Sequence, residues 1–541
     1  MTMELSRRAL LQGGVAAGAA VLGGVVAASS LTSCAPQGDG AGKELSSTGG
    51  QEVPSPITTT YDCDIVVMGC GFSGLAACVQ AAESGAKVIG LEASTATGGG
   101  AYGIEGTLGI DTPLSRENGV TVDTVALLNS EMQASQWRAD GLCWLDLLNN
   151  SADNIDWLIG QGVPFSGLVD DYWGREYATF HWYEGGHASE GYSKTMTDRA
   201  EELGVQFLLS TTGKQLVFGD DGSVAGVYAE TADGWIQVNA KAVIMAGGSF
   251  ANDPELLSHI GFHSDRILMA YEGGLGHSLR MAISAGGRDD SVHACGGSCP
   301  AVEALPPSSI VWGVLNEQMF YLNYDFVWIN ENCERFFRED AGSTAGKNLE
   351  NQTPPQWAQK DVYILFDSAM YEKYALNAED FEGDASYPVA ERYMEVIDEA
   401  VKTNNGNSLY RSDTIAGLAE PFGLDPQALE KFVSEYNAMC AAGKDTVWGK
   451  DPQYLLPLST PPYYIAKPVN HVMNTFGGIA TNRHFQVITN EREPIERLYA
   501  IGNDGCMLYR NVYNIGVPGG ISAHCVNSGR NAAKHAVEHC L

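Results

Sequence analysis

Three glycines in the stretch Asp64–Ser94 follow the spacing G-x-G-x-x-G, whose chemistry is to hold the pyrophosphate of a dinucleotide. Gly69 permits a tight turn, Gly71 lets the backbone approach a pyrophosphate, and Gly74 lets a helix pack closely on a strand. The N-terminus of that helix offers free N–H groups and a partial positive charge. Glu92 stands where an acid typically binds a ribose hydroxyl. The pattern predicts a nucleotide site; the alternative is a βαβ turn that holds no ligand.

A strand, a helix and a second strand must position these glycines. Ile65–Met68 is apolar and β-branched, as parallel strands buried on both faces are. Leu75–Ser84 is rich in alanine and has no breaker, so it predicts a helix that Gly85 ends. Lys87–Leu91 predicts the second strand.

The rest of the chain divides into three parts, of which the first and the last share sequence patterns that the middle part lacks. A helical pattern covers 123–161, a strand is predicted over Val205–Ser210, and an antiparallel meander ends in a buried strand over Ala242–Ala246. From about 256 to 455 the glycine patterns stop and aromatic-rich and helical stretches alternate, whereas 456–541 returns to strand, glycine turn and helix. We therefore predict an α/β protein with a Rossmann-like nucleotide domain in two parts, 61–255 and 456–541, around an inserted α+β capping domain over 256–455.

The N-terminal residues are predicted to be a targeting segment. Residues 1–34 carry a twin arginine before an apolar Ala/Gly/Val-rich stretch, which is typical of a twin-arginine signal peptide. "LTSC" ends at Cys34 and is similar to a lipoprotein cleavage box; the alternative is an ordinary signal peptide cut nearby. Residues 35–60 are expected to be a flexible linker. We expect membrane attachment by a lipid anchor only.

The net charge argues against two classes of partner, and the cysteine pattern argues against a disulfide framework. The chain of 541 residues has 66 acidic and 32 basic residues, a net charge of −34, which argues against nucleic acid and anionic lipid as partners. The 12 cysteines are scattered, and Cys70 and Cys78 belong to the nucleotide element, so no disulfide framework is predicted. No metal site is predicted; an iron–sulfur site would need four cysteines gathered in space.

Four stretches together resemble the flavoprotein family of fumarate reductases, succinate dehydrogenases and 3-ketosteroid Δ1-dehydrogenases. They are "GCGFSG…LE", "AKAVIMAGGSF", "NENCERFFRED" and "TFGGIATN…LYAIGND…GGISAHCVNSGR", in order across residues 62–538. The resemblance implies a glutathione-reductase-like βαβ domain that binds FAD and a cap that closes over the flavin. The FAD-binding residues it implies are Gly69, Gly71, Phe72, Ser73, Gly74, Glu92, Ala93, Gly98, Gly99, Gly100, Gly247, Asp504, Gly519, Gly520, Ile521 and Ser522.

The sequence departs from the family at its substrate-binding positions. Fumarate reductases have an "HHTMGG"-like motif, whereas this chain has "VMNTFGG", which puts Asn474 in the place of a substrate-binding histidine. The arginine of their "NRLGG", which grips a dicarboxylate, falls on Val517, and their proton-delivering arginine falls near Ser343. A short dicarboxylate substrate is therefore not expected.

Other residues are candidates to replace them. "MLYRNVYNIG" offers Tyr509, Arg510 and Tyr513: an arginine could bind a carboxylate or phenolate, and a tyrosine could protonate an α-carbon or hold an enone oxygen. The alternative is that Arg510 is a solvated surface charge and that both tyrosines are packing residues. Arg338 is a further catalytic candidate, with an ion pair to Glu339 or Asp340 as its alternative.

These features predict an exported FAD-dependent reductase of an activated C=C bond, in an enone or acrylate-type acid bulkier than fumarate. A flavin passes hydride from N5, so the protein must orient and polarise the small unsaturated substrate and supply a proton. Electrons are expected from an external membrane or periplasmic donor in anaerobic respiration. Two alternatives stay open: a dehydrogenase of the 3-ketosteroid Δ1 type, and a non-catalytic lipoprotein that binds flavin or another ligand.

Overall fold

The structure is a computed structural model, and it describes residues 53–172, 175–260, 273–302, 324–340, 356, 358–376, 399–402, 408–510, 512–514 and 516–541. The predicted signal peptide over 1–34, the first part of the linker and the position near Ser343 lie outside these residues.

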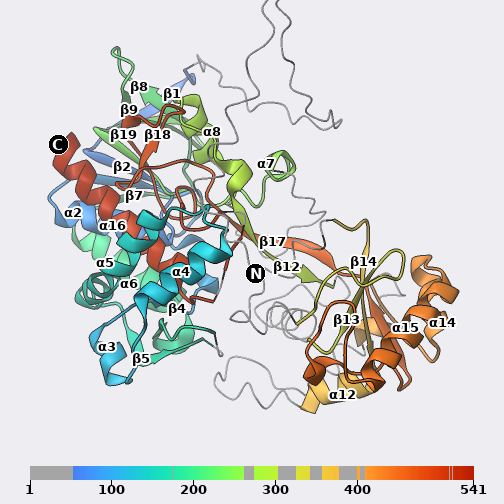
Figure 1. The fold of residues 1–541 in the computed structure, drawn as a ribbon. Helices are drawn as coiled ribbons and strands as arrows, with labels where there is room; N and C mark the ends of the chain where they lie inside the picture. Colours follow the sequence, from blue (N-terminus) through green and yellow to red (C-terminus); the bar gives the residue numbers. More distant parts are fainter. Residues whose placement is uncertain are drawn as a thin grey trace, which may run out of the picture. The chain divides into compact units, whose positions relative to one another are not determined.

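A six-stranded sheet lies at the centre of the nucleotide domain (Figure 1). Its strand order is β18-β19-β11-β2-β3-β7; β18 is antiparallel to its neighbour and the others run parallel. The bounds are β2 (Ile65–Met68), β3 (Val88–Leu91), β7 (Gln206–Leu208), β11 (Ala242–Met245), β18 (Gln486–Ile488) and β19 (Pro494–Ala500). The strands predicted on either side of the glycine motif are confirmed, as are those predicted near 205 and 242.

Hydrophobic clusters cover both faces of this sheet because successive side chains of a strand point to opposite faces. Ile65 and Val67 pack into a cluster with the helices α2 (Phe72–Glu83) and α16 (Gly520–Cys540). Val66 and Met68 pack into a second cluster on the other face. This two-sided burial explains why β2 reads as an unbroken apolar run, and it fixes the glycine loop that follows the strand.

Smaller elements surround the sheet. One antiparallel group contains β8 (Thr212–Phe218), β9 (Val224–Thr231) and β10 (Gly234–Asn239), and a three-stranded sheet contains β4 (Gly106–Leu108), β5 (Phe165–Asp170) and β6 (Phe180–Tyr183). Further helices are α3 (Pro113–Glu117), α4 (Thr124–Ala134), α5 (Gly141–Gly160), α6 (Lys194–Glu202), α7 (Pro254–His259) and α8 (His277–Ser284). None of the helices in the described part of the chain is long and apolar enough to span a membrane.

Two sequence expectations need correction here. The helix expected over 123–161 is interrupted, because Gln136 and Trp137 adopt φ values of 54° and 59° and Asp140 then caps α5 by accepting from two backbone N–H groups. The linker expected over 35–60 ends earlier, because β1 (Ile57–Asp62) pairs in parallel with β10.

A separate hydrophobic cluster forms the core of the inserted segment. Its antiparallel sheet has the order β13-β14-β16-β15, with β13 (Val327–Asn330), β14 (Val362–Asp367), β15 (Leu409–Ser412) and β16 (Tyr463–Ala466). The helices α12 (Ser368–Leu376), α14 (Ile415–Ala419) and α15 (Pro426–Ala441) accompany it. β12 (Cys295–Ala301) and β17 (Val469–Phe476) pair with each other in a two-stranded sheet of their own.

The packing moves the limits of the inserted segment away from 256 and 455. Leu256 of α7 and Leu279 of α8 belong to the cluster on the six-stranded sheet, so this stretch packs as part of the nucleotide domain. β16 lies beyond 455, yet it pairs with β14 and β15 of the inserted sheet. Composition did not show these transitions because both cores are built from the same apolar residue types.

Candidate active site

A cavity of about 360 Å³ opens beside the glycine loop, within the size range of cofactor and ligand pockets. The predicted FAD-binding residues that line it are Gly69, Gly71, Phe72, Ser73, Glu92, Ala93, Gly99, Gly100, Gly247, Asp504, Ile521 and Ser522. Gly74, Gly98, Gly519 and Gly520 do not line the cavity, although Gly98 forms a bridge with the lining residue Gly71 and Gly519 caps the helix α16, which begins at Gly520. Most of the FAD-binding residues predicted from the sequence therefore line one cavity.

The glycine loop is packed too tightly for a side chain at Gly69 or at Gly74. Gly69 has a φ of +95°, and a Cβ on it would lie 2.3 Å from the carbonyl oxygen of Ala246. A Cβ on Gly74 would lie 1.9 Å from the carbonyl oxygen of Gly69. Helix α2 starts after Gly71 with no side-chain cap and no acidic residue in its first turn, so its N–H groups face the cavity end of the helix. This cradle fits the pyrophosphate of a dinucleotide.

Two buried carboxyl groups line the same cavity. Glu92 accepts hydrogen bonds from the backbone N–H groups of Cys70 and Ser94, both at 2.9 Å, which fixes its carboxylate at the end of β3. Asp504 accepts from the N–H of Gly248 at 3.1 Å, and burial raises the pKa of its carboxyl to about 7. Both positions suit hydrogen bonds to hydroxyl groups of the cofactor, and the assignment of Glu92 to the ribose stays a prediction.

Asn474 and Tyr513 reach the cavity from different elements. Asn474 lies on β17, and its Oδ1 accepts from Nδ2 of Asn503 at 3.2 Å. The Tyr513 ring lies 4.5 Å from the Phe476 ring, and both rings line the cavity. An amide and a phenol therefore stand on one wall, which is a donor set for a substrate oxygen and a source of a proton.

Sequence reasoning missed several lining residues. Asn503, Phe476 and the pair Thr211–Thr212 line the cavity but were not among the candidates. Thr211 and Thr212 come shortly after the carboxyl end of β7, and Thr212 begins β8. The rule that ligands bind at the carboxyl ends of parallel strands could have found them.

Arg510 and Tyr509 are not among the residues that line the cavity. The Arg510 side chain is only 13% exposed, and its two terminal nitrogens pair with the two carboxylate oxygens of Asp290 at 2.9 and 3.0 Å. The Tyr509 ring is buried and meets the Trp144 ring edge-on at 5.6 Å. Arg510 is therefore not a solvated surface charge, and the alternative of a packing role fits Tyr509.

Arg338 also has a carboxylate partner. Its Nε lies 2.8 Å from Oδ1 of Asp340, whose other oxygen accepts from the N–H of Asp451 at 3.0 Å. The structure thus favours the ion pair that the sequence left as the alternative to a catalytic role.

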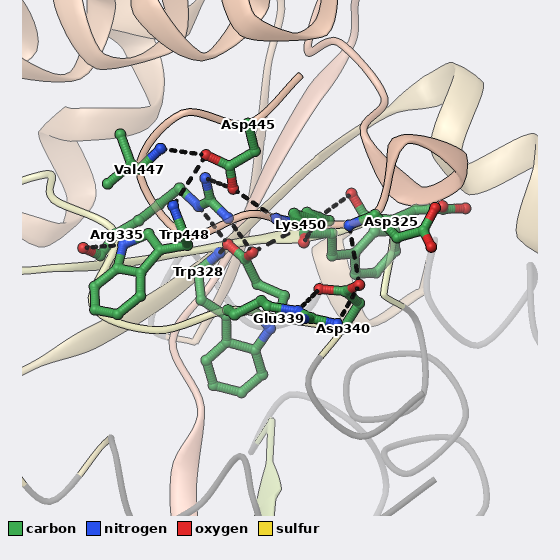
Figure 2. A network of polar contacts seen from close by, with 12 residues as sticks. Asp325, Trp328, Arg335, Glu339, Asp340, Asp445, Val447, Trp448 and Lys450 are labelled. Carbon is green, nitrogen blue, oxygen red and sulfur yellow. Dashed lines mark hydrogen bonds and ion pairs between the residues drawn. The ribbon is translucent and has the colours of Figure 1, made fainter. Parts of the chain in front are cut away.

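A buried charge cluster fixes the segment around Arg338. Arg335 donates to both oxygens of Glu339, at 2.8 and 2.5 Å, and to Asp445 at 2.9 Å. Figure 2 shows Arg335 between these two carboxylates, with Lys450 on the other side of Glu339. The four side chains are at most 3% exposed. The cluster therefore holds the core of the inserted segment together by charges that water does not screen.

Burial of Glu131 leads to a prediction on pH. The carboxyl is 2% exposed; burial raises its pKa well above the ordinary 4.5, although a hydrogen bond from Asn514 opposes the shift. The folded protein keeps a proton that the unfolded chain releases, so the free energy of unfolding falls as pH rises from 4.5 toward the raised pKa, by up to about 1.4 kcal/mol per pH unit. Urea unfolding at a series of pH values should show that the free energy of unfolding falls less steeply with pH in Glu131→Gln than in wild type. The exposed Glu117→Gln is the control, and equal slopes in all three proteins would contradict the prediction.

Comparisons with known proteins agree with this site. A family model described as "FAD binding domain" matches residues 64–517. A vinyl phenol reductase of Lactiplantibacillus plantarum is 30% identical over 88% of this chain and 96% of its own, and a digoxin reductase of Eggerthella lenta is 26% identical over 94% and 91%.

Solved structures share the fold. An open flavocytochrome c3 fumarate reductase aligns with a TM-score of 0.64 and 23% identity over 90% of this chain and 79% of its own. A 3-ketosteroid Δ1-dehydrogenase of Sterolibacterium denitrificans aligns with a TM-score of 0.66 and 16% identity over 88% and 99%. With the glycine cradle, the family match establishes that this chain belongs to the FAD binding domain family and is a FAD-dependent oxidoreductase.

Proposed function

We propose that this enzyme reduces an activated C=C bond in an enone or acrylate-type acid bulkier than fumarate. Its relatives support this reaction class: besides the vinyl phenol and digoxin reductases, they include a urocanate reductase of Eggerthella lenta and fumarate reductases of Shewanella frigidimarina. When bound, FAD supplies the hydride from flavin N5.

The observation that carries the substrate class is the aromatic wall beside Asn474. Phe476 and Tyr513 present ring surface to the cavity, which suits a planar unsaturated group better than a small dicarboxylate. Val517, where the fumarate reductase pattern has an arginine, is 2% exposed and packs in the hydrophobic cluster with α2. Val517 therefore contributes apolar packing, and it offers no positive charge to the second carboxylate of a dicarboxylate substrate.

Each group on the wall has a definite task. Asn474 donates a hydrogen bond from its amide to a carbonyl, carboxylate or phenolate oxygen of the substrate, because its own oxygen is occupied by Asn503. Tyr513 provides a proton for the substrate carbon. Helix α16 starts after Gly519 without a side-chain cap or an acidic first turn, so its N-terminus would stabilise negative charge on a flavin bound in the cavity.

The proposal extends to the cell envelope. The sequence pattern of residues 1–34 supports export by the twin-arginine route, with a lipid on Cys34 holding the enzyme at the outer face of the cytoplasmic membrane. Electrons then come from a separate membrane or periplasmic donor, and the enzyme serves as a terminal reductase in anaerobic respiration.

A comparison of the two reaction directions tests the proposed activity. Under anoxia, reduced viologen with an unsaturated acceptor should give rapid turnover, and the matching saturated compound with a dye acceptor should give slow turnover. Faster oxidation of the saturated compound would instead identify a dehydrogenase, and no turnover in either direction would favour a flavin carrier.

A further inference from the structure

Two buried anchors flank Tyr513 on the loop that carries it. Arg510 precedes the tyrosine and Asn514 follows it, and each is bound by a carboxyl group from a distant part of the chain. The loop is thus held on both sides of the residue that enters the cavity.

The first anchor is Asp290, which lies between α8 and β12. Its side chain is 6% exposed and receives the Arg510 guanidinium in a parallel, two-point contact at 2.9 and 3.0 Å. Such two-point contacts fix orientation as well as distance. Arg288 also binds this carboxylate, at 2.9 Å from Oδ1, so Asp290 itself cannot swing away from the loop without losing both cations.

Asp290 also sets the distance between the two groups on the cavity wall. Its backbone N–H donates to the carbonyl oxygen of Gly478 at 2.8 Å, two residues beyond the end of β17. β17 carries Asn474, and the loop held by the Asp290 carboxylate carries Tyr513. One residue therefore ties both elements together, and the relative position of amide and phenol depends on it.

The second anchor is Glu131 on α4. Oε1 of Glu131 accepts from Nδ2 of Asn514 at 2.8 Å, and the two residues are 2% and 4% exposed. Water cannot replace this bond at such burial, so loss of the acceptor leaves a buried amide N–H without its partner. Ring contacts complete the enclosure: the Tyr513 ring lies 4.8 Å from Tyr509 and 4.5 Å from Phe476.

We propose that Asp290 and Glu131 are positioning residues that hold Tyr513 on the cavity wall that also carries Asn474, through Arg510 and Asn514. This rests on the proposed function in that Tyr513 is taken to be the proton source for the reduced carbon. Misplacement of a catalytic group by about 1 Å can cost on the order of a hundredfold in rate, so loss of either anchor should act on kcat more than on KM.

The test compares Asp290→Asn with wild type in three measurements on the FAD-loaded enzyme. Trypsin should cut after Arg510 about tenfold faster, since the guanidinium is no longer held in its two-point contact. The visible circular dichroism of bound FAD should change as the Tyr513 ring leaves its place. Turnover of an unsaturated acceptor should fall by about tenfold or more in kcat, with little change in KM.

Matched variants separate positioning from general damage. Asp289→Asn changes the neighbouring carboxylate, which pairs with His259 rather than with the loop, and should match wild type in all three measurements. At the second anchor, Glu131→Leu should lose kcat, and Glu131→Gln should restore much of it because the amide oxygen still accepts from Asn514.

The possible outcomes are distinct. Unchanged kcat in Asp290→Asn, with or without faster cleavage, would overturn the positioning role, as would equal losses in Asp289→Asn. If wild type turns over no unsaturated acceptor, the proposed reductase activity fails. Even without turnover, the other two measurements would still test whether Asp290 anchors the loop. Unaltered trypsin cleavage and FAD dichroism in Asp290→Asn would overturn this anchoring role, and changes in both would support it.

Discussion

Gly74→Ala is expected to lose FAD. The added Cβ would lie 1.9 Å from the carbonyl oxygen of Gly69 and 3.5 Å from the Cβ of Ala246, and the first of these contacts is with backbone. Helix α2 must therefore move away from the loop, which displaces the N–H groups that would hold the pyrophosphate of FAD. Overpacking of this kind costs about 1–3 kcal/mol, or roughly 5- to 150-fold in the Kd of FAD.

The measurement is the dissociation constant of FAD from flavin fluorescence on titration of apoenzyme. Gly160→Ala is the control, since Gly160 ends α5 with nothing within 4 Å of an added Cβ. Wild-type affinity in Gly74→Ala would show that the cradle is not where the pyrophosphate lies.

Glu339→Ala is expected to destabilise the inserted segment strongly. Arg335 would lose both of its contacts with Glu339 and keep Asp445 alone, while Lys450 stays fully buried. Removal of one partner from a buried charge cluster leaves an uncompensated charge in a low-dielectric core, which costs about 3–5 kcal/mol. The midpoint of urea unfolding should therefore fall, as followed by tryptophan fluorescence.

Glu334→Ala removes the same charge from an exposed site five residues earlier and should stay within about 0.5 kcal/mol of wild type. A loss in Glu339→Ala as small as in this control would mean that the cluster in Figure 2 contributes little to stability.

The sequence was sufficient for the nucleotide domain because its signals are local. The run from Ile65 to Glu92 contains strand, glycine turn, helix and strand in immediate succession, and backbone contacts exclude a Cβ at both Gly69 and Gly74. Burial on both faces of β2 left an apolar run that is readable without any partner strand. The family match and the FAD cofactor follow from the same stretch and its C-terminal counterpart.

The partners of the loop residues could not be predicted in this way. Arg510 meets Asp290 across 220 positions and Asn514 meets Glu131 across 383, so no local spacing links them. The arginine at position 510 suggested a substrate anchor when only the residue type was known. In the folded protein, Arg510 instead pairs with the carboxylate of Asp290. The limits of the inserted segment were missed for a similar reason, since β16 joins its sheet only through pairing with β14 and β15.

Single-turnover reoxidation of the reduced flavin tests the proposed activity most directly. Purified enzyme, reduced stoichiometrically under anoxia, would be mixed with a hydroxystyrene, an enone, a cinnamate-like acid, urocanate and fumarate while the flavin absorbance is followed. We predict rapid reoxidation by one of the bulky classes and slow reoxidation by fumarate, in keeping with the ring surfaces of Phe476 and Tyr513 on the cavity wall. Fumarate as the fastest acceptor, or no reoxidation by any compound while FAD stays bound, would contradict it.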